Sequence, residues 1–348
     1  MTFLPNKFQF IYNMIQSMKG LMYAMKARIL QTECHDPWRN LAVEACLFEA
    51  LGEDEAVLYL WQNSATVVVG RHQNAWQECR VQLLEAEGGK LARRSTGGGA
   101  VFHDLGNLNF SFVVPRGCYD VSRQLDVVRR AVAEYGIEAR FTGRNDLTVD
   151  GAKFSGNAYK FSDKVGLHHG TLLVNVDMEK LSRYLAPGKD KLKARGIESV
   201  RSRVRNLAEI NPSVDIEGLA QAMRRAFEAE YGAAGIIDGN DLEGPRLSQL
   251  EAMYSSWDFR LGKALPFDAR LTSRFDWGGV TLELSLKQGR VTSAKVWSDA
   301  MDDAMIDAIA PALMGTRYEN SALAEAVRTL KGPQTREIAD WLSTVELG

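Results

Sequence analysis

One twelve-residue stretch combines groups that suit the binding of an anion. Residues 93–104 read RRSTGGGAVFHD, so Arg93 and Arg94 precede two hydroxyl side chains and three consecutive glycines. Successive backbone N–H groups without Cβ atoms can turn toward one point and form a concavity that holds an anion. Arginine adds planar donors that match phosphate and carboxylate groups. The stretch therefore predicts an anion-binding loop, and the alternative is a flexible turn with two solvated arginines.

A lysine further along the chain is a second candidate for chemistry. Lys153 follows the hairpin-turn signal Asp150-Gly151 by two residues, so we expect it on a strand, with its ammonium directed to one sheet face. Such a compact charge can meet a carboxylate and a phosphate together. The alternative is an ordinary surface lysine. Asp146 could orient this lysine or help to hold a metal ion, and its alternative role is to cap a turn.

Three histidines are candidates for metal ligands or binding groups. His168 and His169 are adjacent, so on a strand they point to opposite faces and cannot readily share one ion. We interpret both as hydrogen-bonded structural residues. His103 stands beside the glycines and is the better candidate for a binding site.

A long charged segment follows the strand that carries the histidine pair. Residues 184–203 contain a Pro-Gly break and six basic side chains, which is typical of a mobile excursion from the core. Arg201, Arg203 and Arg205 alternate and would share one face of an extended segment. Their functional interpretation is contact with a phosphate or an acidic protein, and the alternative is a solvated run of charge.

Composition limits the classes of protein that this chain can represent. Its 348 residues allow one large domain or two ordinary ones. A net charge of −2 argues against bulk binding of nucleic acid, and we find no apolar run long enough to span a membrane. The four cysteines form no CxxC pair, so free thiols and a reducing, cytoplasmic location are expected.

The pattern of apolar residues predicts an α+β protein with two domains. Mixed strands and packed helices form a large domain, and a meander followed by helices forms a small α+β accessory domain at the C-terminus. The expected parts are an N-terminal extension over 1–24, a large domain over 25–240, a Gly- and Asp-rich linker over 241–252, and the accessory domain over 253–348.

Taken together, the motifs resemble one known family. RRSTGGGAVFHDLGN, GRNDL, KFSGNAY, HHGTLLVN and GIESVRSRVRNL occur in the order found in bacterial lipoate–protein ligase A. The resemblance runs from Met25 to the C-terminus. It implies a biotin/lipoate ligase-like fold for the large domain, followed by the accessory domain.

The resemblance also implies an activity. Ligases of this family use ATP and Mg²⁺ to convert free lipoate to lipoyl-AMP, with release of pyrophosphate. They then transfer the lipoyl group to a lysine of apo lipoyl domains, in 2-oxoacid dehydrogenase E2 subunits and the glycine cleavage H protein. A cytoplasmic monomer without nucleic-acid or membrane partners is expected.

Residue roles follow from the same resemblance. Lys153 would be the catalytic residue that touches both substrates, and the metal ligands stay unassigned. Segment 184–203 would close over the adenylate. The ATP contacts would be Arg94, Gly99, Ala100, Val101, Phe102 and Lys153, and the lipoate contacts would be Arg93, Ser95, Gly97, Gly98, His103 and Lys153.

Three other activities compete with this interpretation. An octanoyl or lipoyl transferase of the same fold works without ATP and needs a nucleophilic cysteine after residues 166–177. The last cysteine here is Cys118, which disfavours that reaction. A non-catalytic carrier or sensor of lipoyl-adenylate is disfavoured, because Lys153 and the whole glycine-rich stretch 93–104 are present. Biotin–protein ligase is a more distant alternative, because its own glycine–arginine signature is missing.

Overall fold

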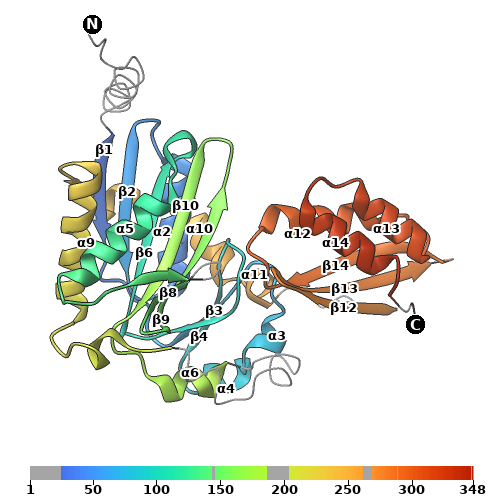
Figure 1. Ribbon diagram of the computed structural model, residues 1–348, viewed down its shortest axis with the longest axis horizontal. Helices are drawn as coiled ribbons and strands as arrows, with labels where there is room; N and C mark the ends of the chain where they lie inside the picture. The colour runs from blue at the N-terminus through green and yellow to red at the C-terminus, as the bar shows by residue number, and fades with distance from the viewer. Residues whose placement is uncertain are drawn as a thin grey trace, which may run out of the picture.

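The chain folds into a large domain and a smaller one beside it (Figure 1). The computed structural model describes residues 25–142, 146–185, 204–261, 268–287, 289–345 and 347. The large domain combines a mixed sheet with helices, and the small domain is a three-stranded sheet with its own helices. The predicted α+β class, with a large mixed-sheet domain and a small C-terminal α+β domain, is confirmed.

An eight-stranded mixed sheet forms the centre of the large domain, in the order β11-β1-β2-β6-β10-β9-β8-β7. A hairpin joins β8 to β9 through Asp150 (φ 50°) and Gly151 (φ 78°), which is the left-handed turn that the Asp-Gly pair predicts. The strands are β1 (Lys26–Gln31), β2 (Glu55–Trp61), β6 (Asn107–Pro115), β7 (Arg140–Thr142), β8 (Asp146–Val149), β9 (Ala152–Phe161), β10 (Val165–Leu173) and β11 (Gly235–Ile236).

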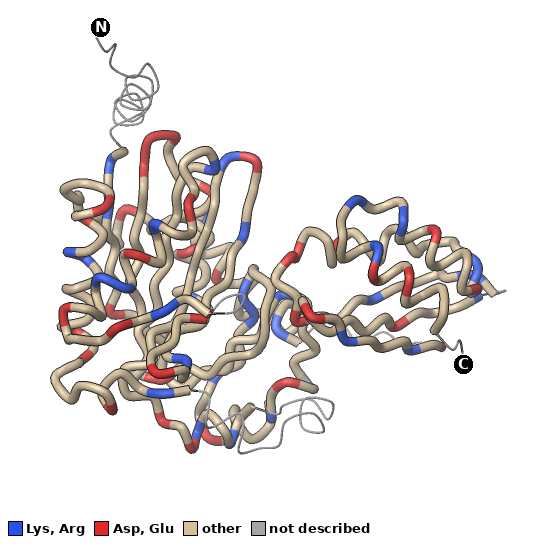
Figure 2. Tube along the Cα trace, in the orientation of Figure 1, with Lys and Arg blue, Asp and Glu red and all other residues tan. Residues whose placement is uncertain are grey.

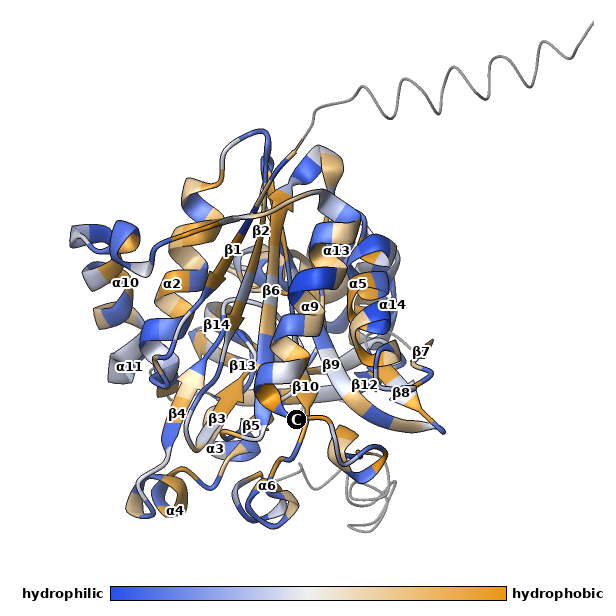
Figure 3. Ribbon diagram, turned by 90° about the vertical axis from the view of Figure 1, so that its left-hand side faces the viewer, coloured by the Kyte–Doolittle hydropathy of each residue, from blue (hydrophilic) through white to orange (hydrophobic). Residues whose placement is uncertain are grey.

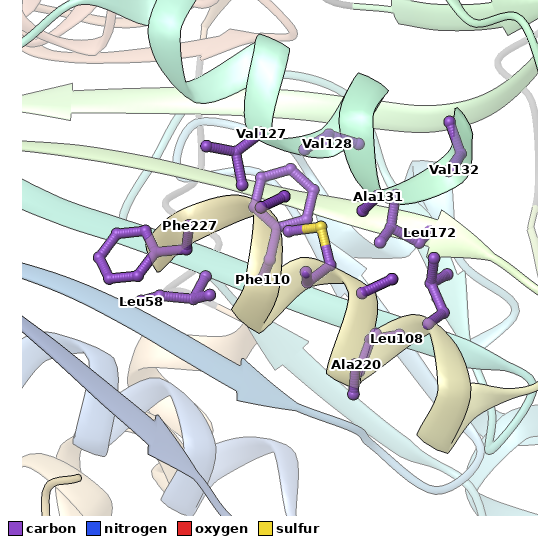
Figure 4. Close-up of a cluster of buried hydrophobic side chains, with 14 of the residues drawn as sticks. Leu58, Leu108, Phe110, Val127, Val128, Ala131, Val132, Leu172, Ala220 and Phe227 are labelled. Carbon is purple, nitrogen blue, oxygen red and sulfur yellow. The ribbon is translucent and has the colours of Figure 1, made fainter. Parts of the chain in front are cut away.

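Helices cover both faces of this sheet (Figure 3). Helices α5 (Val121–Ala133) and α9 (Ile216–Tyr231) pack on one face, where Phe110 and Phe227 belong to a fully buried cluster (Figure 4). Helix α2 (Pro37–Ala50) packs on the other face. It begins at Asp36, whose carboxylate accepts from the Trp38 N–H, and Pro37 occupies its first turn.

A second, three-stranded sheet carries the glycine-rich loop. Its order is β4-β3-β5, with β3 (Thr66–Val69) parallel to β4 (Lys90–Arg93) and antiparallel to β5 (Val101–His103). The chain from 94 to 100 links β4 to β5, so the loop joins the two outer strands of this sheet. Short helices α3 (Ala75–Glu78), α4 (Val81–Ala86) and α6 (Met178–Tyr184) lie around it.

The accessory domain has its own core. Helices pack on a meander and bury Leu282, Ile309 and Leu342 completely. Its elements are β12 (Ala269–Phe275), β13 (Gly278–Lys287), β14 (Arg290–Ser298), α12 (Asp303–Leu313), α13 (Asn320–Arg328) and α14 (Pro333–Leu342). It meets the large domain through an Arg71–Asp307 ion pair of 2.7 Å and a hydrogen bond of 2.6 Å from the Ser298 N–H to the His72 carbonyl.

The segment 241–252, expected to be a linker, is mostly helical. Only a short 3₁₀ turn, η3 (Gly239–Leu242), precedes helix α10 (Pro245–Ser255), which packs on α2. Leu250 and Tyr254 join the buried cluster of the large domain, and α11 (Trp257–Leu261) follows. The apolar residues of α10 therefore make this segment part of the large domain, which extends to Leu261.

Charge is mixed in sign along the described part of both domains. Figure 2 shows basic and acidic residues interspersed over both domains. Within the described part of the chain, no helix is long and apolar enough to cross a membrane. The expected extension over 1–24 lies outside the described residues.

Candidate active site

A cavity of about 120 Å³ lies between the two sheets of the large domain. Its walls include apolar side chains from three elements, namely Leu41, Trp61 and Val68, and the glycine loop contributes Gly99 and Ala100. Lys153, Asn109 and Thr171 add polar groups. A mainly apolar cavity with a few convergent polar groups is typical of a small-molecule site.

Arg94 gives the glycine loop its shape. Its guanidinium donates to the Gly97 carbonyl at 2.7 Å, to the Gly99 carbonyl at 2.8 Å and to the Thr96 hydroxyl at 3.0 Å. Gly98 adopts φ +90°, a left-handed conformation that favours glycine. Burial lowers the pKa of Arg94 to about 10, so the residue keeps its charge at neutral pH. The loop is therefore built around a buried cation, and the flexible-turn alternative is wrong.

Arg93 faces away from this cavity, because neighbouring residues at the end of a strand point to opposite sides. Its guanidinium donates to five backbone carbonyls in two segments, those of Gly70, Arg71, Gln73, Phe259 and Arg260. Burial lowers its pKa to about 10. This geometry gives Arg93 a structural role, which ties residues 70–73 and the end of α11 to β4. Ser95 likewise lines a separate cleft beside Tyr254.

Gly97 and Gly98 contact the accessory domain. The Gly98 N–H donates to the Ala300 carbonyl at 2.9 Å. A Cβ atom on Gly97 would lie 2.3 Å from the same oxygen, which is too close for any other residue. The two glycines thus allow residues 300 and 301 to approach the loop, and they do not line the cavity. Gly99, by contrast, has open space where a Cβ would stand.

Lys153 stands at the β9 end of the cavity. The β8–β9 register shifts beside it, and such a bulge re-aims a side chain. Its Nζ lies 2.7 Å from Asp146 Oδ1, so Asp146 is placed to orient the lysine, which is the first of the roles predicted for it. A Cβ atom on Gly156 would lie 2.8 Å from Nζ. Gly156 therefore leaves the space that the lysine occupies.

The adjacent histidines point to opposite faces, as predicted. His168 contacts Gln124 at 3.0 Å and Asn157 at 2.8 Å, on the side of α5. His169 contacts Glu44 at 2.8 Å and Thr96 at 2.9 Å, on the side of the cavity. No group of three potential metal ligands occurs in the described ranges. Both histidines are hydrogen-bonded structural residues, and His169 also lines the cavity.

Glu44 was not found by sequence reasoning. It is 2 % exposed and accepts hydrogen bonds from His169 and from the Ser111 hydroxyl at 2.5 Å. Burial by itself would raise its pKa, but the charge of His169 and these hydrogen bonds hold the pKa below its usual value. The signal in the sequence is Asn40 and Glu44, two polar residues four positions apart on a helix face that also buries Leu47.

The remaining candidates divide between described and undescribed parts of the chain. Val101 and His103 line the cavity, whereas the Phe102 side chain is buried against Tyr184 at a ring distance of 5.6 Å. Arg205 lies 3.6 Å from Asp150 and 3.9 Å from Glu209. Arg201, Arg203 and the proposed closing loop, apart from residues 184 and 185, lie outside the described residues.

Comparisons with known proteins identify the family. Residues 36–228 match the Lipoyl protein ligase A/B catalytic domain, and residues 264–342 match the Bacterial lipoate protein ligase C-terminus. The fold is therefore that of a lipoate–protein ligase, with a catalytic domain followed by the C-terminal domain of such ligases. The chain belongs to the lipoate–protein ligase family, as its motifs indicated.

Solved structures agree with this assignment. LipL1 of P. falciparum, in complex with lipoate, has a TM-score of 0.81 and 28 % identity over 91 % of this chain and 99 % of that one. A bipartite lipoate protein ligase from Thermoplasma acidophilum, solved with its E2 lipoyl domain, has a TM-score of 0.61 and 26 % identity, with coverages of 70 % and 99 %. A lipoate–protein ligase A bound with ATP has a TM-score of 0.60 and 26 % identity, with coverages of 68 % and 99 %.

Proposed function

We propose that this ligase activates free lipoate with ATP and transfers the lipoyl group to a lysine of apo lipoyl domains. One observation supports the proposal most strongly. Lys153 and the glycine loop, which is built around the buried Arg94 guanidinium, both adjoin one apolar cavity. That arrangement suits a substrate with an apolar tail and a reactive carboxylate. It also provides positive charge where a carboxylate must meet a phosphate.

The residues divide between the two substrates. Lys153 would contact both, and the backbone from Gly99 to Phe102 would follow the nucleotide. His103 would contact lipoate inside the cavity. Arg94 would act by shaping the loop and by its charge. Arg93, Ser95, Gly97 and Gly98, assigned to lipoate by resemblance, do not line the cavity, so we propose that they act by positioning the loop.

The adenylation step requires two anions to approach each other. The lipoate carboxylate attacks the α-phosphorus of ATP, an acyl-phosphate bond forms, and pyrophosphate leaves. Lys153 would offset the repulsion between carboxylate and phosphate and hold both in line. In the second step, an acceptor lysine attacks the carbonyl carbon and AMP leaves.

Mg²⁺ would enter with the phosphates of ATP and neutralise part of their charge. The described residues do not form a ligand set for it, since no group of three carboxylate, histidine or cysteine side chains occurs among them. Asp146 is paired with Lys153.

The acceptors would be E2 lipoyl domains and the glycine cleavage H protein. The T. acidophilum relative was solved with its E2 lipoyl domain, which supports the first of these. Cytoplasmic location and a monomeric state complete the proposal. Four cysteines without disulfides suit a reducing compartment.

A transferase that uses a cysteine thioester is the rival activity. Burial raises the pKa of Cys79 to about 12 and also raises that of Cys46, which opposes formation of a nucleophilic thiolate. None of the four cysteines lines the cavity. The geometry thus favours the ATP-dependent reaction.

Intact mass spectrometry of an apo lipoyl domain tests the proposal. With enzyme, ATP, Mg²⁺ and lipoate, the domain should gain one lipoyl group, and omission of ATP should abolish the gain. An octanoyl-thioester donor without ATP should give no transfer. Modification that does not depend on ATP would refute the proposed reaction and favour the transferase.

A further inference from the structure

Two polar side chains that line the cavity each carry a buried nitrogen without a hydrogen-bond partner among the described residues. His103 is 3 % exposed and Asn109 is 1 % exposed, and both line the cavity. Across the described ranges, neither His103 Nε2 nor Asn109 Nδ2 has a hydrogen-bond partner. Buried polar groups are nearly always paired in folded proteins. Two such groups beside one cavity therefore point to a ligand.

A chain of buried hydrogen bonds determines which nitrogen of His103 carries the proton. The Tyr59 hydroxyl donates to Asn40 Oδ1 at 3.1 Å, and Asn40 Nδ2 donates to Asn63 Oδ1 at 3.0 Å. The orientation of the Asn63 amide is thereby set, and its Nδ2 donates to His103 Nδ1 at 3.1 Å. A neutral imidazole whose Nδ1 accepts carries its hydrogen on Nε2.

Both groups that face the cavity are hydrogen-bond donors. Burial lowers the pKa of His103 to about 3, with smaller effects from the charges of Arg94 and His169, so the ring is neutral at physiological pH. Its Nε2–H is then a donor. Asn109 Oδ1 accepts from Asn107 Nδ2 at 2.9 Å, which leaves Asn109 Nδ2 as the second donor.

Asn109 stands two strands away from Lys153 across the large sheet, and His103 lies beside Trp61. The ring of His103 meets that of Trp61 edge-on at 6.3 Å, and Asn109 stands opposite Trp61 in the β2–β6 register. In the strand order β6-β10-β9, two interstrand steps separate Asn109 from β9, where Lys153 stands. This amounts to about 10 Å. A substrate with its carboxylate at Lys153 therefore directs its tail toward His103 and Asn109.

We propose that His103 and Asn109 recognise the sulfur atoms of the dithiolane ring and so distinguish lipoate from saturated acids of similar length. The inference rests on the proposed function, because it takes the carboxylate to lie at Lys153. Divalent sulfur accepts hydrogen bonds weakly, and a methylene group accepts none. A saturated tail would leave both donors buried and unsatisfied. Asn63 is a positioning residue that holds His103 in the donating tautomer.

Adenylation kinetics with matched substrates test the proposal. Pyrophosphate exchange is measured with lipoate, with octanoate and with 5-cyclopentylpentanoate, which keeps the ring and the chain but lacks sulfur. In the wild type, kcat/KM for lipoate should exceed that for the cyclopentyl acid roughly tenfold, as expected for one unsatisfied buried donor. His103→Phe and Asn109→Leu should each reduce this ratio to roughly threefold or less.

The ratio of kcat/KM for lipoate to kcat/KM for the cyclopentyl acid distinguishes a loss of substrate specificity from a loss of folded enzyme. Two substrates measured on one preparation share the same active fraction, so partial misfolding leaves the ratio unchanged. Tyr231→Phe is the matched control, because it removes a buried hydroxyl in α9 that does not line the cavity. Its ratio should equal that of the wild type.

Nitrogen-15 NMR of the wild-type imidazoles supplies a readout independent of activity. His103 should be protonated at Nε2 in the free enzyme, and its Nε2 signal should move with lipoate more than with the cyclopentyl acid. An Nδ1–H tautomer, equal kcat/KM for the two acids in an active wild type, or unchanged ratios in both variants would overturn the donor pair. If His103→Phe does not fold, Asn109→Leu and the NMR experiment decide. A wild type inactive with ATP and lipoate would contradict the proposed function instead.

Discussion

Glu44 and His169 are joined by a hydrogen bond of 2.8 Å, although 125 residues separate them in the chain. The bond connects α2 to β10 and continues through Thr96 to Arg94. A buried carboxylate thus supports the side chain that shapes the glycine loop. Because these groups are buried, removal of Glu44 takes away the acceptor of His169 Nδ1 and of the Ser111 hydroxyl inside the protein.

Glu44→Ala should therefore destabilise the protein by about 3–5 kcal/mol, which is typical of breaking a buried charged pair. Urea denaturation provides the measurement, with Glu53→Ala, at an exposed turn, as the control. The folded pKa of Glu44 is lowered. Its contribution to stability should then be present above the ordinary pKa of glutamate and be lost as the pH falls through the folded value. The difference in the free energy of unfolding between the wild type and Glu44→Gln should shrink as the pH falls. A difference that grows as the pH falls would contradict this account.

Lys153→Ala should remove adenylation while the fold persists. The side chain is about one-third exposed and its ion pair with Asp146 is also partly exposed, so little stability depends on it. Loss of a donor to developing charge should lower kcat/KM for pyrophosphate exchange at least roughly hundredfold. Lys164→Ala, at an exposed position between β9 and β10, should behave as the wild type. Near-normal exchange by a folded Lys153→Ala protein would refute the assignment.

Gly156→Ala tests the path of the lysine side chain. The new Cβ would stand 2.8 Å from Lys153 Nζ, the flexible end of a side chain, so the lysine should move with little loss of stability. A displacement of this size should lower kcat/KM roughly tenfold to hundredfold. The comparison is Gly117→Ala, where a Cβ meets no atom within 4 Å. Unchanged adenylation in Gly156→Ala would show that the lysine does not need this position.

Gly97→Ala addresses the contact between the two domains. Its Cβ would lie 2.3 Å from the Ala300 carbonyl oxygen, a backbone atom that cannot turn aside. We expect the accessory domain to separate from the loop while both cores remain folded, since each is built from its own residues. Small-angle X-ray scattering should show a larger radius of gyration than for Gly99→Ala, which has open space at its Cβ. Identical scattering curves would show that the contact does not hold the domains together.

Local rules account for the features that the sequence predicted well. The Asp150-Gly151 turn adopts its left-handed conformation and places Lys153 at the start of a strand. His168 and His169 diverge because successive strand residues alternate between faces. These outcomes depend on a few neighbouring residues, which the sequence shows directly. The ordered motifs also indicated the family that the comparisons identify.

Only the tertiary structure decided which neighbours complete the site. Whether Arg93 or Arg94 faces the cavity depends on how β4 is seated beside β3, and the structure directs Arg93 to the carbonyls of 70–73 and α11. The assignment of residues 241–252 to the large domain likewise depends on the packing of α10 against α2. Asn63 and Glu44 act on histidines 40 and 125 residues away. Such contacts arise when strands and helices pack together, so residue types and spacing along the chain do not specify them.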